Sequence, residues 1–207
     1  MIINIQVTNC EVKMGIKEQF IEIYNREIKR DGAKKMLEYL EGSDFFTAPA
    51  STRFHLAREG GLCEHSLNVY YRLKELVENE KSDWARKVSG ESIAIIALLH
   101  DLCKVGMYVV DYKNQKQPDG SWAKVPYYTI DELLPYGHGE KSVYIINGFI
   151  RLTREEAICI NWHMGGYDER VKGGSYSAIA KAYEQYPLAV LTHIADVMAS
   201  YLDEDRN

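Results

Sequence analysis

Apolar residues recur at helical spacing near the start of the chain. The spacing predicts a helix over residues 16–30 whose inner face carries four residues, Phe20, Ile21, Tyr24 and Ile28. A second, shorter helix is expected over residues 33–40, with Asp31 as a candidate N-terminal cap and Gly42 as its stop. The first dozen residues alternate only loosely, so a short strand and a loose arm are both open there.

The strongest helical patterns lie further along the chain. Residues 62–80 are amphipathic, and the apolar side of this expected helix consists of Leu62, Leu67, Tyr70, Leu73, Leu76 and Val77. Residues 92–103, SIAIIALLHDLC, are apolar nearly all round, which predicts a central helix that is buried on most of its faces. Residues 43–61 have the Pro, Ser and Gly content of a loop, yet their aromatic side chains must pack against something or line something.

The pattern changes in the middle of the chain. MYVVDY and VPYYTI are short runs of β-type residues, and a polar segment containing Asp119-Gly120 separates them. We therefore expect a β-hairpin inserted between helices. Its tyrosines suit cross-strand packing and also stacking on a base: Tyr108, Tyr112, Tyr127 and Tyr128.

Helical spacing returns after the hairpin. One helix is expected over residues 141–150, and the sequence TREE at residues 153–156 has the form of a capping box that opens a helix reaching residue 163. The next segment, GGYDERVKGGSYS, is expected to form a glycine-rich loop. Two last helices are expected over residues 177–186 and 187–203, and the proline that begins the second suits a first turn.

Composition narrows the class of protein. The 207 residues are 46% apolar and 27% charged, so the predicted elements are expected to form one mostly all-α domain with a small β-hairpin. No apolar run approaches the roughly 18–20 residues of a membrane helix, and the start shows no secretory pattern, so a cytoplasmic protein with no membrane partner is expected. Thirty acidic and twenty-five basic residues give a net charge of −5, which disfavours long duplex DNA as a partner.

The cysteines do not have the spacing of a metal site. Cys10, Cys63, Cys103 and Cys159 are scattered along the chain without a CxxC pair. In a chain that is expected to be cytoplasmic, they are interpreted as buried thiols and not as a zinc knuckle.

Six histidines are modest in number, but their placement is unusual. His65 lies midway along the first long helix, and His100-Asp101 ends the most apolar one, where two adjacent ionisable residues are costly unless they are paired or bound to a metal. His138 lies in a Gly-His-Gly turn, and His163 ends a helix. With the carboxylate in the apolar run AVLTHIADVMASYL, the ordered set is His65, His100, Asp101, His138, His163 and Asp196.

Four imidazoles and two carboxylates suit a metal site. A mixed shell of this kind favours Mn, Fe or Zn, with Mg also possible. One carboxylate can bridge two cations, and a pair about 3.5–4 Å apart can activate a water while clamping a phosphoryl oxygen. Burying these groups with no cation would leave several of them unpaired, each at a cost of about 1–3 kcal/mol or more. We therefore expect divalent first-row metal ions, two of them if all six residues are ligands.

This ordered set, with HD followed by Lys in HDLCK, resembles the HD-domain metal-dependent phosphohydrolases. The chain is more closely similar to the HD domain that ends the YhaM-type 3′→5′ exoribonucleases. The similar stretches span about residues 45–199: FFTAPAS, GGLCEHSLNVY, ALLHDLCKVG, GHG, NWHMGG and LTHIADVMA. The resemblance implies an HD-domain helical bundle with the metal site at its centre, an HD core over about residues 45–204 and a helical N-terminal extension over about residues 1–44.

The resemblance also implies two metal ions that share one carboxylate. The first would be held by His65, His100, Asp101 and Asp196. The second would be held by His138 and His163, with Asp101 bridging. Lys104, one turn after His100 on the same face, would meet a substrate phosphate and act with Asp101 in catalysis.

Other candidate residues come from the loops. Arg53 and His55 lie in the aromatic loop, where capping the core and reaching a substrate are both open. Arg170 and Lys172 lie between glycines, which suits a mobile phosphate-binding loop and equally a solvated turn. His193, one turn before Asp196, is a candidate partner that orients this carboxylate.

The leading hypothesis is a metal-dependent phosphohydrolase that cleaves a small phosphorylated substrate such as a nucleotide, an ester or a diester. The first alternative is a nuclease that trims short single-stranded RNA or DNA. The short helical N-terminal segment is not expected to form an oligonucleotide-binding domain, which disfavours processive digestion of RNA. The second alternative is a regulatory module that binds metal and nucleotide without turning the nucleotide over.

Overall fold

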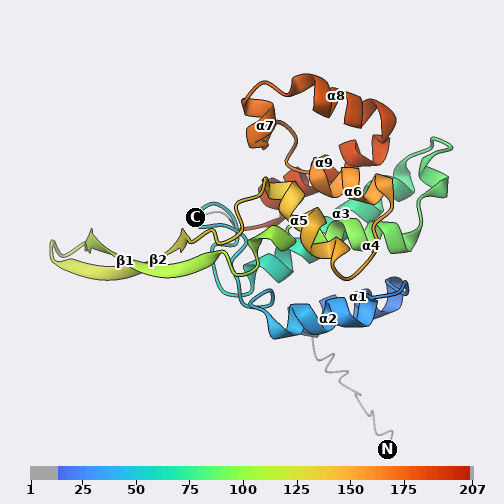
Figure 1. Ribbon diagram of the computed structural model, residues 1–207. Helices are drawn as coiled ribbons and strands as arrows, with labels where there is room; N and C mark the ends of the chain where they lie inside the picture. The colour runs from blue at the N-terminus through green and yellow to red at the C-terminus, as the bar shows by residue number, and fades with distance from the viewer. Residues whose placement is uncertain (1–13, 206–207) are drawn as a thin grey trace, which may run out of the picture.

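Figure 1 shows a computed structural model of the protein, which describes residues 14–205. The alternatives for the first dozen residues lie outside this range. The described chain is mostly helical with one small antiparallel sheet, which confirms the predicted mostly α-helical fold with a hairpin. Its helices are α1 (Ile16–Glu27), α2 (Ala33–Gly42), α3 (Gly61–Asn79), α4 (Gly90–Leu99), α5 (His138–Asn147), α6 (Arg154–Asn161), α7 (Glu169–Lys172), α8 (Tyr176–Gln185) and α9 (Pro187–Met198).

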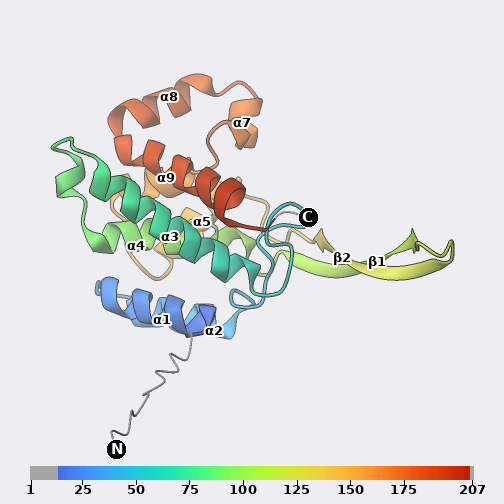
Figure 2. The same ribbon diagram turned by 180° about the vertical axis from the view of Figure 1, so that it is seen from behind.

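The core forms where α3, α4, α6 and α9 pack together. Figures 1 and 2 show α3 between α1 and α2 on one side and α9 on the other, with α8 covering the outer face of α9. Every residue of α4 from Ile93 to Leu99 is buried, as its uniformly apolar sequence predicts. None of the helices described between residues 14 and 205 combines the length and hydropathy that crossing a membrane requires.

The turn between α1 and α2 differs from the prediction. The α1 helix ends at Glu27, and α2 begins directly after Gly32, which occupies the N-cap position with a φ of +90°. A Cβ on this glycine would lie 1.8 Å from the carbonyl oxygen of Phe149. Close packing against a neighbouring backbone therefore decides where α2 begins, and the predicted cap Asp31 does not occupy the capping position.

The ends of two further helices change the setting of predicted site residues. The α4 helix, capped by Ser89, ends at Leu99 and not at residue 103. A 3-10 turn (Leu102–Lys104) follows it, so His100 and Asp101 lie at the junction of the two elements. The α5 helix begins at His138, three residues before the predicted start, so this histidine belongs to a helical first turn.

The later segments agree more closely with the pattern. Thr153 caps α6 through the predicted capping box, with its hydroxyl accepting from the Glu156 amide. The glycine-rich segment is not a simple loop, because it contains a 3-10 turn (Gly165–Tyr167) and the short α7. After α9, a π-helical turn (Ala199–Asp203) continues the predicted helix. A further 3-10 turn (Ala85–Lys87) connects α3 to α4.

The hairpin projects away from the helices (Figure 1). Strands β1 (Tyr108–Lys116) and β2 (Trp122–Ile130) pair in antiparallel register from Tyr108↔Ile130 to Lys116↔Trp122. The rings of Tyr108 and Tyr128 are 6.5 Å apart, which is the expected cross-strand packing. The base of the hairpin lies beside the site described next.

Candidate metal centre

Asp101 lies at the centre of the predicted ligands, and each of its carboxylate oxygens faces a different pair of histidines. The carboxylate is buried, with 2% of the residue exposed. Oδ2 lies 3.5 Å from Nε2 of both His65 and His100. Oδ1 lies 2.8 Å from Nε2 of His138 and 3.4 Å from Nε2 of His163. The structure therefore brings two triads together that share one acid.

The first triad, formed by His65, His100 and Asp101, lies beside a second carboxylate, Asp196. His65 comes from the second turn of α3 and His100 from the end of α4, and their Nε2 atoms are 3.2 Å apart. Asp196 on α9 places Oδ1 3.2 Å from Nε2 of His65. Nδ1 of His100 donates to the Ala97 carbonyl oxygen, 2.8 Å away, which leaves its Nε2 directed to the cluster.

The second triad forms where α5 meets the end of α6. Gly139, the residue after His138, packs directly against the backbone of Asn161, since a Cβ there would lie 2.3 Å from the Asn161 carbonyl oxygen. This close approach brings His138 to His163, whose rings are 5.1 Å apart. The Gly-His-Gly sequence thus has a packing reason: a larger residue after the histidine would push the two ligands apart.

One atom of the second triad lacks a hydrogen bond. Nε2 of His163 is buried and makes no hydrogen bond within the described residues, whereas its Nδ1 contacts the Ile160 carbonyl at 2.6 Å. A buried nitrogen without a partner costs about 1–3 kcal/mol. Since this nitrogen faces Asp101 beside His138, a cation bound there would offset the cost. The donor set therefore fits a divalent metal.

The charges of the cluster also fit a cation. Burial would lower the pKa of His65, but its bonds to Asp196 and Glu204 raise it to about 10. Burial opposes protonation of His138 too, yet its neighbours Cys103 and Asp101 raise its pKa to about 10. Burial raises the pKa of Asp101, but the adjacent Lys104 ammonium and the contact with His138 hold it well below its ordinary value, so this carboxylate stays ionised. Metal binding would displace the protons of the two histidines.

His100 and the neighbouring carboxylate of Asp196 have protonation states that also suit a cation. Burial and the neighbouring histidines lower the pKa of His100 to about 3, so its ring is neutral, as a metal ligand must be. Although burial favours its neutral form, the pKa of Asp196 falls below the ordinary value because of its bond to His65. A neutral imidazole beside two ionised carboxylates is a ligand set that several first-row divalent ions accept.

Lys104 is the last residue of the 3-10 turn that follows Asp101, and it is nearly buried. Its Nζ lies 2.6 Å from Oδ2 of Asp101 and donates to the Ala50 carbonyl at 2.7 Å. Burial would lower the pKa of this ammonium, but Asp101 raises it above its ordinary value, so the side chain is charged. The cation lies at the wall of a cavity of about 570 Å³.

That cavity is where a ligand could reach the cluster. Its wall includes Asp101, His138 and Asp196 from the cluster, together with Lys104 and two of the predicted substrate residues, His55 and Lys172. Most of the other side chains in the wall are aromatic or apolar: Ala50, Phe54, Met107, Tyr108, Ile130, Met164, Tyr167, Val197 and Tyr201. The remaining polar residues are Ser51, Thr52, Glu169 and Ser200. An apolar wall beside a few convergent charged groups is typical of a small-molecule site.

Two other predicted substrate residues lie elsewhere. Arg53 is not among the residues that line this cavity, and its guanidinium stacks on Phe54. Arg170 is also outside the lining. It pairs with Asp168 and Glu140 at 2.7 Å each and donates to the carbonyl of Asn161 at 2.9 Å. Arg170 therefore connects α5 to the end of α6.

His193 contacts a different partner from the predicted one, whereas the described cysteines are buried as predicted. Nδ1 of His193 lies 2.7 Å from the carbonyl oxygen of His163, so the contact is to the second triad and not to Asp196. Cys63, Cys103 and Cys159 are buried and unpaired, as predicted, while Cys10 lies outside the described residues. Cys103 is 3.4 Å from the ring nitrogens of His138.

Sequence reasoning missed Glu204. Its side chain is fully buried, and it contacts Nδ1 of His65 at 2.9 Å and Nδ1 of His55 at 2.5 Å. It lies in the acidic stretch DEDR at the end of the last helix, and such a stretch is typical of solvated surface. Nothing in the pattern distinguishes Glu204 from its neighbours, because its burial depends on how the chain turns after α9.

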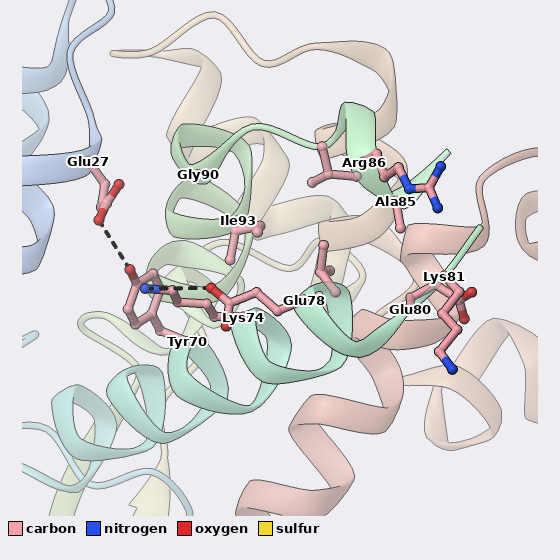
Figure 3. Close-up of a pocket in the computed structure, with 12 residues that line it drawn as sticks. Glu27, Tyr70, Lys74, Glu78, Glu80, Lys81, Ala85, Arg86, Gly90 and Ile93 are labelled. Atoms are coloured by element: carbon pink, nitrogen blue, oxygen red, sulfur yellow. Dashed lines mark hydrogen bonds and ion pairs between the residues drawn. The ribbon is translucent and has the colours of Figure 1, made fainter. Parts of the chain in front are cut away.

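A second cavity, of about 580 Å³, lies between α1, α3 and α4 (Figure 3). None of the predicted site residues lines it. Two contacts connect residues that line it: Tyr70 donates to Glu27 at 3.4 Å, and Lys74 lies 3.9 Å from Glu78. None of the described residues that line it is a histidine or a cysteine.

No protein-family model, curated protein or solved structure matches this chain. The case for a function therefore rests on the geometry of the cluster and its cavity.

Proposed function

We propose that the protein is a metal-dependent phosphohydrolase of the HD superfamily that acts on a nucleotide or another small phosphate ester or diester. The observation that carries the proposal is the placement of Asp101, whose two oxygens each face a separate pair of histidines. The arrangement of the set on α3, α4, α5, α6 and α9, around a buried centre, supports the HD-domain helical bundle. It also supports two ions that share one acid.

Bound first-row ions would supply an activated water and charge to neutralise a phosphoryl oxygen. The chain's own residues provide the positioning and a further positive charge. Asp101 and the histidines fix the positions of the ions, and Lys104 adds a positive charge at the cavity wall, where negative charge develops on the phosphoryl group. Because Lys104 is held by Asp101 and Ala50, it is already oriented before a substrate arrives.

The cavity supports a substrate of nucleotide size. A volume of about 570 Å³ is within the range of small-molecule pockets, roughly 300–1,000 Å³. The phosphate end of a substrate would lie near Lys104 and Asp101. The aromatic residues Phe54, Tyr167 and Tyr201 would face its less polar part, where a planar base can stack.

A short single-stranded nucleic acid is the second candidate substrate, and the hairpin favours it. Strand alternation and the register place one face of the hairpin in line with Tyr108 and Ile130, which line the cavity. Four aromatic residues and two lysines share that face, and no acidic residue does: Tyr108, Tyr112, Trp122, Tyr128, Lys116 and Lys124. Aromatic side chains and lysines together suit stacked bases and phosphates.

The test is hydrolysis by metal-loaded protein of a panel of nucleotides, bis(p-nitrophenyl) phosphate, p-nitrophenyl phosphate and short oligonucleotides, with Asp101→Ala as the control. The proposal predicts turnover of at least one small substrate, absent in the control. Faster turnover of oligonucleotides, with binding that weakens as salt rises, would instead favour the nuclease. Binding of nucleotides with no hydrolysis by the metal-replete protein would refute both and favour a regulatory module.

A further inference from the structure

Glu204 connects the segment after α9 to the metal centre. Its Oε1 lies 2.9 Å from Nδ1 of His65 and accepts from the Asn68 amide at 3.1 Å, while its Oε2 lies 2.5 Å from Nδ1 of His55. The carboxylate is fully buried. One acid thus contacts two imidazoles, one in the first triad and one in the wall of the cavity.

The backbone on both sides of this acid is anchored. Arg72 on α3 forms an ion pair with Asp203, and the amide of Leu56 in the aromatic loop donates to the Asp205 carbonyl at 3.1 Å. The carboxylate is therefore held between α3 and the loop by its neighbours in sequence. Its position does not depend on the histidines alone.

The chemistry of a carboxylate fixes the protons of both rings. Both oxygens of Glu204 are used as acceptors: the Asn68 amide and His65 share Oε1, and His55 contacts Oε2. An ionised carboxylate only accepts hydrogen bonds, so Nδ1 of each ring must carry the proton. When a metal displaces the second proton of His65, the nitrogen left with a lone pair is Nε2, the atom that faces His100 and Asp196.

We propose that Glu204 is a positioning residue of the metal centre, which holds His65 with Nδ1 protonated and Nε2 presented to the first ion. The inference rests on the metal site of the proposed function and not on hydrolysis. The same contact orients His55, leaving its Nε2 as the nitrogen available to a ligand in the cavity. A carboxylate behind a metal-binding imidazole fixes the ring and raises its basicity.

The discriminating variant is Glu204→Gln. The amide has the same shape, but its oxygen can accept from one ring while its NH₂ group presents a donor to the other. Whichever way it lies, one imidazole loses its partner or changes tautomer. We expect the affinity for the first Zn²⁺ or Mn²⁺ ion, measured by competition with a chromophoric chelator, to fall about 10–100-fold.

The matched control is Glu64→Gln. It makes the same substitution next to His65, at a carboxylate that pairs with Arg58 and contacts neither histidine. We expect the metal affinity of this control to stay within about threefold of that of the unsubstituted protein. This change is well below the 10–100-fold loss expected for Glu204→Gln. Circular dichroism of the metal-free variants checks that each is folded.

A second measurement needs no variant of the acid. In zinc-loaded protein with ¹⁵N-labelled histidine, long-range proton–nitrogen correlations report which nitrogen of each ring carries the proton. His65, assigned with a His65→Asn variant, is expected to carry it on Nδ1. A proton on Nε2 of His65 would overturn the proposal even if Glu204→Gln failed to fold.

Three results are decisive for the variant. Unchanged metal affinity in folded Glu204→Gln would overturn the proposal. Loss of an additional ion, with two ions still bound at full affinity, would also overturn it, because His55, His65 and Glu204 would then form a separate metal site. A 10–100-fold loss in a protein that hydrolyses no phosphate ester would support the role of Glu204 and refute the proposed hydrolase.

Discussion

Asp101→Asn is expected to weaken metal binding at both triads about 100-fold with little change in shape. The substitution replaces one carboxylate oxygen by an NH₂ group, and the side chain faces His65 and His100 through one oxygen and His138 and His163 through the other. Whichever way the amide lies, one triad meets a donor where it had an acceptor. Both lose the negative charge that a cation requires.

The magnitude follows from linkage between metal binding and folding. At a free metal concentration 100 times Kd, one ion stabilises the native state by about 2.7 kcal/mol. For a chain of this size, each kcal/mol raises Tm by roughly 2–4 °C, so each ion should add about 5–11 °C. Loss of a direct ligand should weaken binding at least as much as loss of a residue behind it, about 100-fold. The stabilisation at the same metal concentration then falls to about 0.4 kcal/mol, or roughly 1–2 °C.

The assay is the shift in Tm on adding Mn²⁺ or Zn²⁺, measured for each protein against its own metal-free form. This comparison matters because the substitution also leaves the buried Lys104 without its partner, which lowers the metal-free Tm by itself. Cys103→Ser serves as the control, since its thiol lies beside His138 but is not a predicted ligand. A full metal-induced shift in Asp101→Asn would refute the reasoning.

Three further predictions concern the surroundings of the cluster. Lys104→Met should keep both ions, counted by elemental mass spectrometry, while kcat falls about 10²–10³-fold; an unchanged kcat would exclude its role in charge stabilisation. Arg170→Met should loosen the junction of α5 and α6 and reduce the number of bound ions from two to one, whereas the neighbouring Lys172→Met variant should still bind two. Equal metal counts in the two variants would argue against this role of Arg170. Metal affinity should rise between pH 7 and pH 10, because protons on His65 and His138, each with a pKa of about 10, compete with the ions below that pH. A titration series in which Kd does not change with pH would contradict this.

Much of the fold could be predicted from hydrophobic periodicity. The segment 62–80 has one apolar side, and the structure has α3 within one residue of it at each end. The errors fall at helix ends, where side-chain and backbone contacts between distant segments decide the boundary. Gly32 begins α2 because the backbone of Phe149 leaves no room for a side chain, and no local pattern contains that information.

The candidate site was predictable to the extent that its residues are costly to bury. His100 and Asp101 stand out because they interrupt an apolar helix, and the structure places both in the cluster. Glu204 and Arg170 could not be assigned in this way. Each lies in a polar stretch, and its partners come from helices far away in the sequence, so its role depends on tertiary packing.

The central claim is that the chain binds two divalent ions around Asp101. The most direct test is the metal content per chain, measured by elemental mass spectrometry on protein purified without chelators or a histidine-rich tag. We predict about two first-row ions per chain, and fewer than one in Asp101→Asn. No bound metal in the unsubstituted protein, after attempted loading with Mn²⁺, Fe²⁺ and Zn²⁺, would contradict the account.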